Sequence, residues 1–418
     1  MTVHGTCDPR FSQVAEEFEA NLAQHGEVGA SVCVIVGGEV AVDLWGGQAA
    51  PGVPWADDTI GHVWSCTKGA TSLCAHMLAA RGDLDLDAPV IRYWPEYGAR
   101  GKGGTLVRHL LAHQAGLPAL REPLPPGAFY DWKLMTGRLA EQEPFWEPGT
   151  RHGYHALTFG YLVGEIVRRV SGRSLGTFFR EEVAEPLGLD FWIGLPEERE
   201  DRVADPATSS RVADSATSSR VAPTIPADPP EAPPSFYLKA FSDPSSMSAL
   251  VLAHEGGYMA LGESDSRAAH AAEIGAVGAI TNARGLAGMY RPLSLGGGDL
   301  VSREHLALMA QTASAGTDAV LLAPTHFALG FMKSVDNRHL PQPDSEGALM
   351  SDTAFGHVGM GGSVGFCDPA ARLAFGYTMN KQFAGLGINP RGQALVDATY
   401  RALGYRQAYG GIWYATGD

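Results

Sequence analysis

A chain of 418 residues can bury a large core in one or two domains, and 45% hydrophobic with 18% charged residues is typical of a soluble globular protein. The formal net charge of −15 argues against nucleic acid and anionic membrane surfaces as partners. The five cysteines form no C-x-x-C pair, so we interpret them as reduced, buried thiols and predict a cytoplasmic location. No apolar run is long enough to span a membrane, and residues 1–10 lack an apolar signal core.

The N-terminal part predicts one helix and one hairpin. Apolar residues at helical spacing from Phe11 to Leu22 indicate an amphipathic helix. The β-branched run from Ala30 to Val36, the Gly37–Gly38 turn and the run from Val40 to Trp45 predict a β-hairpin.

The next stretch carries the spacing S-x-x-K in Ser65 and Lys68, and the residues that follow have helical periodicity to about Arg81–Gly82. Residues three apart on a helix share a face, which places the Lys68 ammonium beside the Ser65 hydroxyl in the first helical turn. A serine with an amine beside it at a helix N-terminus can act as an acyl-transfer nucleophile. The alternatives are a chance match and a serine that only caps the helix. Cys66 is expected to point away from Ser65 and to serve packing.

From residue 81 to about 319 the pattern is mainly helical. A nine-residue unit at 202–210 is nearly repeated at 211–219, a third copy starts at 220–222, and a proline-rich stretch runs to Pro234. A segment with so few apolar residues cannot form a core, and we therefore predict an exposed loop over 200–235. The alternative is a lid over the active site. The helices are expected at 106–111, 159–170, 175–187, 249–252, 267–274, 282–290 and 303–311.

Strand patterns return at the C-terminal end. Phe327–Met332 reads as one strand, and Val364–Cys367 and Leu373–Met379 form a second hairpin around Asp368–Pro369. A last amphipathic helix carries Val396, Tyr400 and Leu403. We therefore predict an α/β (α+β) sheet domain built from 1–80 and 320–418, with 81–319 as a mainly helical domain inserted in it.

Two further motifs follow later in the chain. Residues 147–156 contain a Pro-Gly-x(4)-Tyr run that ends at Tyr154, and residues 356–363 contain His357–Val358–Gly359. Together with S-x-x-K and the LLAHQAGL stretch at 110–117, they resemble the serine β-lactamase-like and penicillin-binding-protein-like hydrolases. Within that family the resemblance is to the class C β-lactamases and the family VIII carboxylesterases. It covers the chain from about Val28 to Gly404.

The resemblance implies a fold and a set of roles. The fold is an antiparallel sheet flanked by helices, with a helical domain beside it and the active site between them. Ser65 would be the nucleophile, and Lys68 and Tyr154 would share the proton transfers. The backbone N–H groups of Ser65 and Met360, the residue after Gly359, would form the oxyanion hole.

The Lys–Tyr pair passes a test of magnitude. A tyrosine needs a pKa shift of about three units, or about 4 kcal/mol, to act as a base at neutral pH. A cation ~4 Å away at an effective dielectric constant of about 20 supplies that much. Which of Lys68 and Tyr154 carries the proton is left open. The alternative for Tyr154 alone is a tyrosine that only packs.

Two departures from the lactamase pattern concern selectivity. Ala156 stands where lactamases carry Asn or Ser, so a side-chain donor for a substrate amide is missing. His357 replaces the lysine of Lys-Thr-Gly, and a histidine near pKa ~6.5 is mostly neutral at pH 7. Both changes favour neutral substrates such as short-chain esters. His357 could donate a hydrogen bond to the acyl intermediate or be merely structural.

Ser363 lies in Gly361–Gly365, which fits the G-x-S-x-G pattern of α/β-hydrolases, but strand sequence follows where that motif needs a helix. We therefore do not assign it as the nucleophile. No metal-ligand spacing or phosphate-binding loop is present, so no metal and no cofactor are predicted.

The sequence thus predicts a serine hydrolase that acylates Ser65, in first place a carboxylesterase for small ester or acyl substrates. The rivals on the same scaffold are a β-lactamase or D-amino-acid peptidase and an acyltransferase. The non-enzymatic rival is a binding or sensor module that is acylated once and does not turn over.

Overall fold

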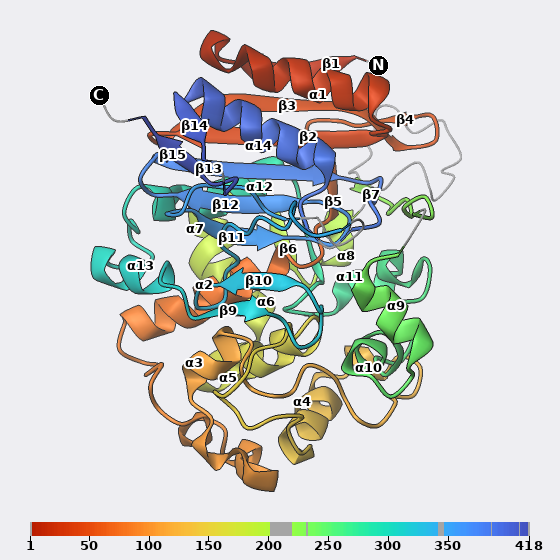
Figure 1. Cartoon of the computed structure of the whole chain (residues 1–418), viewed down its shortest axis with the longest axis vertical. Helices are drawn as coiled ribbons and strands as arrows, with labels where there is room; N and C mark the ends of the chain where they lie inside the picture. The colour runs from red at the N-terminus through yellow and green to blue at the C-terminus, as the bar shows by residue number, and fades with distance from the viewer. Residues whose placement is uncertain are drawn as a thin grey trace.

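The computed structural model describes residues 2–200, 220–230, 233–341, 347–385, 387–408 and 410–416. Over these residues the chain forms a seven-stranded antiparallel sheet with helices on both faces, beside a mainly helical region (Figure 1). The strand order is β1-β3-β2-β13-β12-β11, and β4 pairs with β3. The strands are β1 (Val3–Cys7), β2 (Gly29–Val36), β3 (Glu39–Ala50), β4 (Val53–Pro54), β11 (Phe355–Val358), β12 (Val364–Asp368) and β13 (Leu373–Met379).

The central strand β2 joins the two ends of the chain, because it pairs with β3 on one side and with β13 on the other. Val32 and Val34 pack into the cluster that α1 (Ser12–Gln24) and α14 (Pro390–Ala402) complete on one face. Cys33 and Ile35 belong to the cluster on the opposite face. Both faces are covered, which explains why β2 is a continuous apolar run instead of an alternating one. Both predicted hairpins are confirmed.

The second face of the sheet is covered by α12 (Ala283–Ser294), which packs against β13, β12 and β2. The sequence placed these residues in the helical part of the chain. The division into two domains stays a prediction, and the packing of α12 ties part of 81–319 directly to the sheet.

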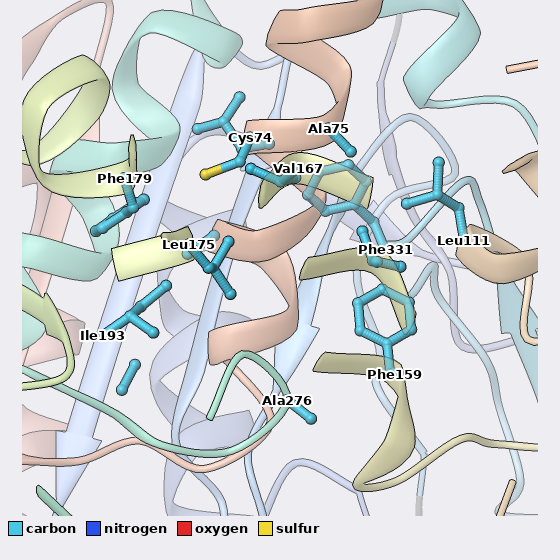
Figure 2. Close-up of a cluster of buried hydrophobic side chains, with 14 of the residues drawn as sticks. Cys74, Ala75, Leu111, Phe159, Val167, Leu175, Phe179, Ile193, Ala276 and Phe331 are labelled. Carbon is cyan, nitrogen blue, oxygen red and sulfur yellow. The ribbon is translucent and has the colours of Figure 1, made fainter. Parts of the chain in front are cut away.

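The helical region is organised around α2 (Thr67–Ala80), whose residues 67–78 are all buried. Figure 2 shows Cys74 and Ala75 of this helix among side chains such as Phe159, Val167 and Leu175 of the surrounding helices. The other helices are α3 (Val107–Leu111), α4 (Trp132–Glu141), α5 (Thr158–Ser171), α6 (Leu175–Phe179), α7 (Glu185–Leu187), α8 (Glu197–Glu200), α9 (Ser235–Ser242), α10 (Met247–Ala253), α11 (Arg267–Ala271) and α13 (Arg303–Met309). Among the residues that the structure describes, no helix has the length and apolar character needed to cross a membrane.

A second, smaller sheet leads into the S-x-x-K motif. Its order is β6-β8-β5-β7, formed by β6 (Phe191–Ile193), β8 (Ala279–Thr281), β5 (Ile60–His62) and β7 (Val221–Ala222). The repeat at 202–219 lies outside the described residues. The start of its third copy is not part of an exposed loop, since Val221 and Ala222 are buried in β7 and pair in parallel with β5.

The strand predicted at Phe327–Met332 is wrong. The chain instead forms a hairpin of β9 (Ser314–Thr317) and β10 (Pro324–Phe327), and then turns. The Ala328 N–H donates to the Phe331 carbonyl at 2.8 Å, and Gly330 has a φ of +84°. An apolar run interrupted by a glycine in the left-handed region is a turn and not a strand. A last hairpin joins β14 (Tyr405–Gln407) and β15 (Trp413–Ala415).

Candidate active site

Ser65 lies in a tight turn between β5 and α2. The helix begins at Thr67 with Cys66 as its N-cap, so Ser65 stands just ahead of the helix and not in its first turn as expected. The Lys68 N–H donates to the Ser65 carbonyl at 3.0 Å, and the preceding Trp64 has a φ of +46°. A bulky residue in the left-handed region is rare and persists only where the surrounding packing holds it. This turn fixes the Ser65 hydroxyl at the wall of a cavity.

Lys68 is completely buried, and its ammonium nitrogen lies within hydrogen-bond distance of three oxygens. Nζ is 3.0 Å from Ser65 Oγ, 2.6 Å from the Ala156 carbonyl oxygen and 3.0 Å from the Ala276 carbonyl oxygen. Burial lowers the pKa of Lys68 well below its ordinary value, because the charged form loses its hydration. The helical spacing seen in the sequence therefore does bring the amine to the serine.

Tyr154 completes the cluster from the other side of the cavity. Its side chain hydrogen-bonds with Ser65, and the Lys68 Nζ lies 4.7 Å from the centre of its ring. Burial raises the pKa of Tyr154 above its ordinary value, and the hydrogen bond with Ser65 only partly offsets this. The structure thus brings Tyr154 to Ser65 and Lys68, although it comes from a distant part of the chain.

His113 and Asp318 hold the backbone around Tyr154. The His113 carbonyl accepts a hydrogen bond from the Gly153 N–H at 3.1 Å. The imidazole Nδ1 of His113 accepts another from the His155 N–H at 3.2 Å. The buried carboxylate of Asp318 accepts a hydrogen bond from the Tyr154 N–H at 3.0 Å. Sequence reasoning quoted His113 inside a motif without giving it a role, and it missed Asp318.

His357 lies on β11 beside the cluster, with its ring 6.1 Å from the Tyr154 ring. Its Nδ1 is 2.8 Å from the Val358 carbonyl, and a carbonyl only accepts, so Nδ1 carries the proton. Among the described residues no group hydrogen-bonds Nε2, which is left as an unpaired acceptor. Burial, with Lys68 nearby, lowers the pKa of His357 to about 3, so the ring is neutral. This arrangement differs from the donor role that the sequence suggested.

Gly359 and Met360 form the turn after β11. A Cβ on Gly359 would lie 2.3 Å from the Val63 carbonyl oxygen and 2.6 Å from Ser363 Oγ, so only glycine lets this turn approach the Ser65 segment. The Ser363 hydroxyl donates to the Val63 carbonyl at 3.3 Å and is fully buried. Met360 lines the cavity at Ser65, whereas Ser363 does not.

The cavity at Ser65, which we call the inner chamber, has a volume of about 90 Å³. Ser65 and Tyr154 line it together with Trp64, Ala156 and Met360. The remaining wall is apolar and includes Leu157, Phe236, Val251, Leu252, Met259, Leu321, Phe327 and Met332. A neutral, largely apolar group fits this lining.

None of the five cysteines, all within the described residues, forms a disulfide. Cys66 adjoins the cluster, but its thiol donates to the His357 carbonyl at 3.3 Å, and burial raises its pKa to about 12. A thiol with so high a pKa is a poor nucleophile, so Cys66 serves packing, as expected.

A family model for the beta-lactamases matches residues 14–398. The chain belongs to the beta-lactamase family. The predicted family and the predicted fold class are therefore confirmed.

Among relatives in this beta-lactamase family, the esterase/beta-lactamase LipL of Mycobacterium tuberculosis is 34% identical over 401 residues, which covers 91% of this chain and 83% of LipL. The crystal structure of a family VIII carboxylesterase is 36% identical, with a TM-score of 0.80 over 96% of this chain and 100% of the other. A penicillin-binding protein homologue from Caulobacter crescentus is 32% identical, with a TM-score of 0.79 over the same shares.

Proposed function

We propose that the protein is a carboxylesterase that forms an acyl-enzyme on Ser65 and hydrolyses small neutral esters. The observation that carries the proposal is the buried contact of 3.0 Å between Lys68 Nζ and Ser65 Oγ at the wall of an apolar chamber. Esterases among the relatives of the family, such as LipL and the family VIII carboxylesterase, support the same activity.

The contacts of Lys68 suggest how the serine is activated. The carbonyls of Ala156 and Ala276 can only accept, so they take two N–H bonds of the amine. Burial favours the neutral amine, whose lone pair then points to the remaining partner, the Ser65 hydroxyl. Lys68 is thus the base: it takes the hydroxyl proton as Ser65 Oγ bonds to the carbonyl carbon of the ester.

The developing oxyanion needs donors. The backbone N–H groups of Ser65 and Met360, both at the inner chamber, are the proposed pair, and each donor is worth about 3 kcal/mol of transition-state stabilisation. The glycine at position 359 keeps the Met360 turn close enough to Ser65 to act.

Collapse of the tetrahedral intermediate breaks the C–O bond to the alcohol. The leaving oxygen takes a proton from the Tyr154 hydroxyl, and Lys68, which holds the former serine proton beside the Tyr154 ring, returns it to the Tyr154 phenolate. In the second half, water attacks the acyl carbon while Tyr154 takes a proton from the water and passes its own proton to Lys68. The bond between Ser65 Oγ and the acyl carbon then breaks, Lys68 returns the proton to Oγ, and the acid is released.

The selectivity residues favour esters over β-lactams. Ala156 offers no side-chain donor to a substrate amide, and the neutral, buried His357 supplies no cation for a substrate carboxylate.

The test uses p-nitrophenyl acetate and butyrate with two matched serine variants. Ser65→Ala should abolish turnover, whereas Ser363→Ala should retain it because that hydroxyl lies outside the inner chamber. Mass spectrometry of the enzyme quenched during turnover should place the acyl group on the peptide that carries Ser65. An inactive Ser363→Ala variant together with an active Ser65→Ala variant contradicts the assignment.

The rival activities give different results in the same assay. Nitrocefin turnover as fast as ester turnover would identify a β-lactamase, and product partitioning toward an added alcohol would identify an acyltransferase. A stoichiometric burst without steady-state turnover would identify a module that is acylated only once.

A further inference from the structure

A second cavity, which we call the vestibule, adjoins the inner chamber and opens to the surface. It has a volume of about 370 Å³, against about 90 Å³ for the inner chamber. Trp64, Tyr237, Met259 and Met360 line both cavities, so the two cavities lie next to each other along these four side chains.

One wall of the vestibule is the proline-rich segment that follows the repeat, in its described residues 226–230 and Pro233. The segment is held on the body of the protein. Ile225 N–H donates to the Asn380 carbonyl and its own carbonyl accepts from Gln382 N–H, both at 2.8 Å. The Thr224 hydroxyl donates to Asp265 at 3.0 Å, and proline fixes the backbone angle φ of the wall itself. The wall is thus formed before a substrate arrives.

The rim of the vestibule exposes large apolar side chains. Leu261 is 85% exposed, Phe241 76% and Phe383 37%, and all three line the vestibule. Apolar surface left in water at the mouth of a site is stabilised when an apolar group covers it. The vestibule thus has the lining of a hydrophobic subsite, and it lies next to the inner chamber that Ser65 lines.

We propose that the vestibule binds the bulkier apolar part of the ester and that the inner chamber takes the smaller part. The preferred substrates then join one short and one bulky apolar group across the ester bond. This inference rests on the proposed ester hydrolysis at Ser65 and adds the shape of its substrate. The bulky group belongs to either the alcohol or the acyl part.

The experiment compares two ester series against ethyl acetate. One series enlarges the alcohol (cyclohexyl and 1-naphthylmethyl acetate), and the other enlarges the acyl group (ethyl hexanoate and ethyl phenylacetate), so every leaving group is an alkoxide and no carbonyl is conjugated. In the wild type, kcat/KM should rise with size in one series, which identifies the bulky part, and 1-naphthylmethyl phenylacetate, bulky on both sides, should be poor.

Variants at the rim of the vestibule then test whether the higher kcat/KM for bulky esters depends on the rim side chains. In Leu261→Ser and in Phe241→Ser, the ratio of kcat/KM for the preferred bulky ester to that for ethyl acetate should fall about fivefold, mainly through KM, because each removes apolar contact area. Val40→Ser is the matched control, since Val40 is 56% exposed on β3 and lines neither cavity; its ratio should stay at the wild-type value.

Three outcomes would overturn the inference. In the first, the rim variants match Val40→Ser in both series. In the second, 1-naphthylmethyl phenylacetate is as good a substrate as the best ester. In the third, the rate jumps only above the solubility limit of the ester, which indicates that the rim binds an aggregate surface. Each leaves the proposed function intact, whereas ester turnover that persists in Ser65→Ala removes the function itself.

Discussion

At the scale of single residues, burial has opposite effects on the two proton carriers beside Ser65. It lowers the pKa of Lys68 and raises that of Tyr154, so the resting pair is a neutral amine and a neutral phenol. From the sequence, a charged Lys68 was expected to lower the pKa of Tyr154. Desolvation reverses this expectation, and residue spacing alone does not show which groups are buried.

In the proposed mechanism, the neutral pair gives Tyr154 the role of an acid toward the leaving group. In Tyr154→Phe, kcat/KM for ethyl butyrate should fall about 10²- to 10⁴-fold, because ethoxide leaves poorly without a proton. The loss for p-nitrophenyl butyrate should be smaller, since p-nitrophenolate leaves as a stable anion. Steady-state kinetics on the two esters measures the difference.

The pH profile of the same variant tests which group is the base. The proposed mechanism requires neutral Lys68, so kcat/KM should rise with pH and level off above the pKa of Lys68, which burial places well below its ordinary value. Tyr154→Phe should keep this acid limb. Equal losses on both butyrates, or disappearance of the limb, would contradict the assignment and make the phenolate the base.

At the scale of elements, the long and strongly periodic segments could be predicted and the short ones could not. The hairpins β2–β3 and β12–β13 and the helices α5 and α14 each carry a full pattern with a turn or cap signal. Strands of two or three residues, such as β5 and β7, have no period to read and exist only because a distant segment pairs with them. The low apolar content of the proline-rich segment predicted an exposed loop. Its backbone contacts with the remote residues Asn380 and Gln382 leave no local sequence signal.

The site residues differ in the same way in how far the sequence predicts them. Ser65 and Lys68 share one local motif, and Tyr154, His357 and Met360 lie in stretches that the family resemblance supplied. Asp318 acts through the backbone of a segment more than a hundred residues away, and no local pattern reports such a contact. The sequence signal that was available is an aspartate directly before the apolar run 319–322, which is typical of a side chain that caps a turn.

Asp318 ties the β9–β10 connection to the Tyr154 segment, which makes it testable as a positioning residue. Its Oδ1 accepts from the N–H groups of Tyr154 at 3.0 Å, Val320 at 2.8 Å and Leu321 at 2.9 Å. Asp318→Ala should lower the free energy of unfolding by about 3 kcal/mol, because buried N–H groups lose their acceptor. It should also lower kcat on ethyl butyrate more than it changes KM, since Tyr154 is displaced.

Asp318→Asn is the matched control. It keeps an oxygen in the Oδ1 position, so it should retain most of the stability and most of kcat. If the alanine variant unfolds like the wild type in urea, or if the asparagine variant loses as much kcat as the alanine variant, Asp318 does not position Tyr154.

At the scale of the whole molecule, the buried histidines determine how the fold responds to acid. His62, His76, His155 and His357 are buried, and burial lowers the pKa of each to about 3. Below the ordinary histidine value of about 6.5 the unfolded chain binds protons that the native state does not, so stability falls as the pH falls. Each contributes up to about 1.4 kcal/mol per pH unit in this window.

Glu27 opposes this trend. Burial raises its pKa to about 7, so between about pH 4.5 and 7 the native state holds a proton that the unfolded chain has lost, and acid stabilises it by about 1.4 kcal/mol per pH unit. One carboxyl cannot offset four histidines. The net expectation is that the free energy of unfolding falls as the pH falls below about 6.5.

Urea unfolding at a series of pH values from 7 down to 5 tests this balance, with His76 as the residue to change because it lies away from the active site. His76 sits on α2, fully buried, with Nε2 bound to the Leu329 carbonyl at 2.8 Å. His76→Asn should reduce the pH slope of the unfolding free energy by about 1.4 kcal/mol per pH unit, whatever its effect at pH 7. His25→Asn, at an exposed position just after α1, should leave the slope unchanged. A wild-type free energy of unfolding that stays constant from pH 7 to 5 would show that these imidazoles are protonated in the native state, and that charged groups are accommodated in a core that we describe as neutral.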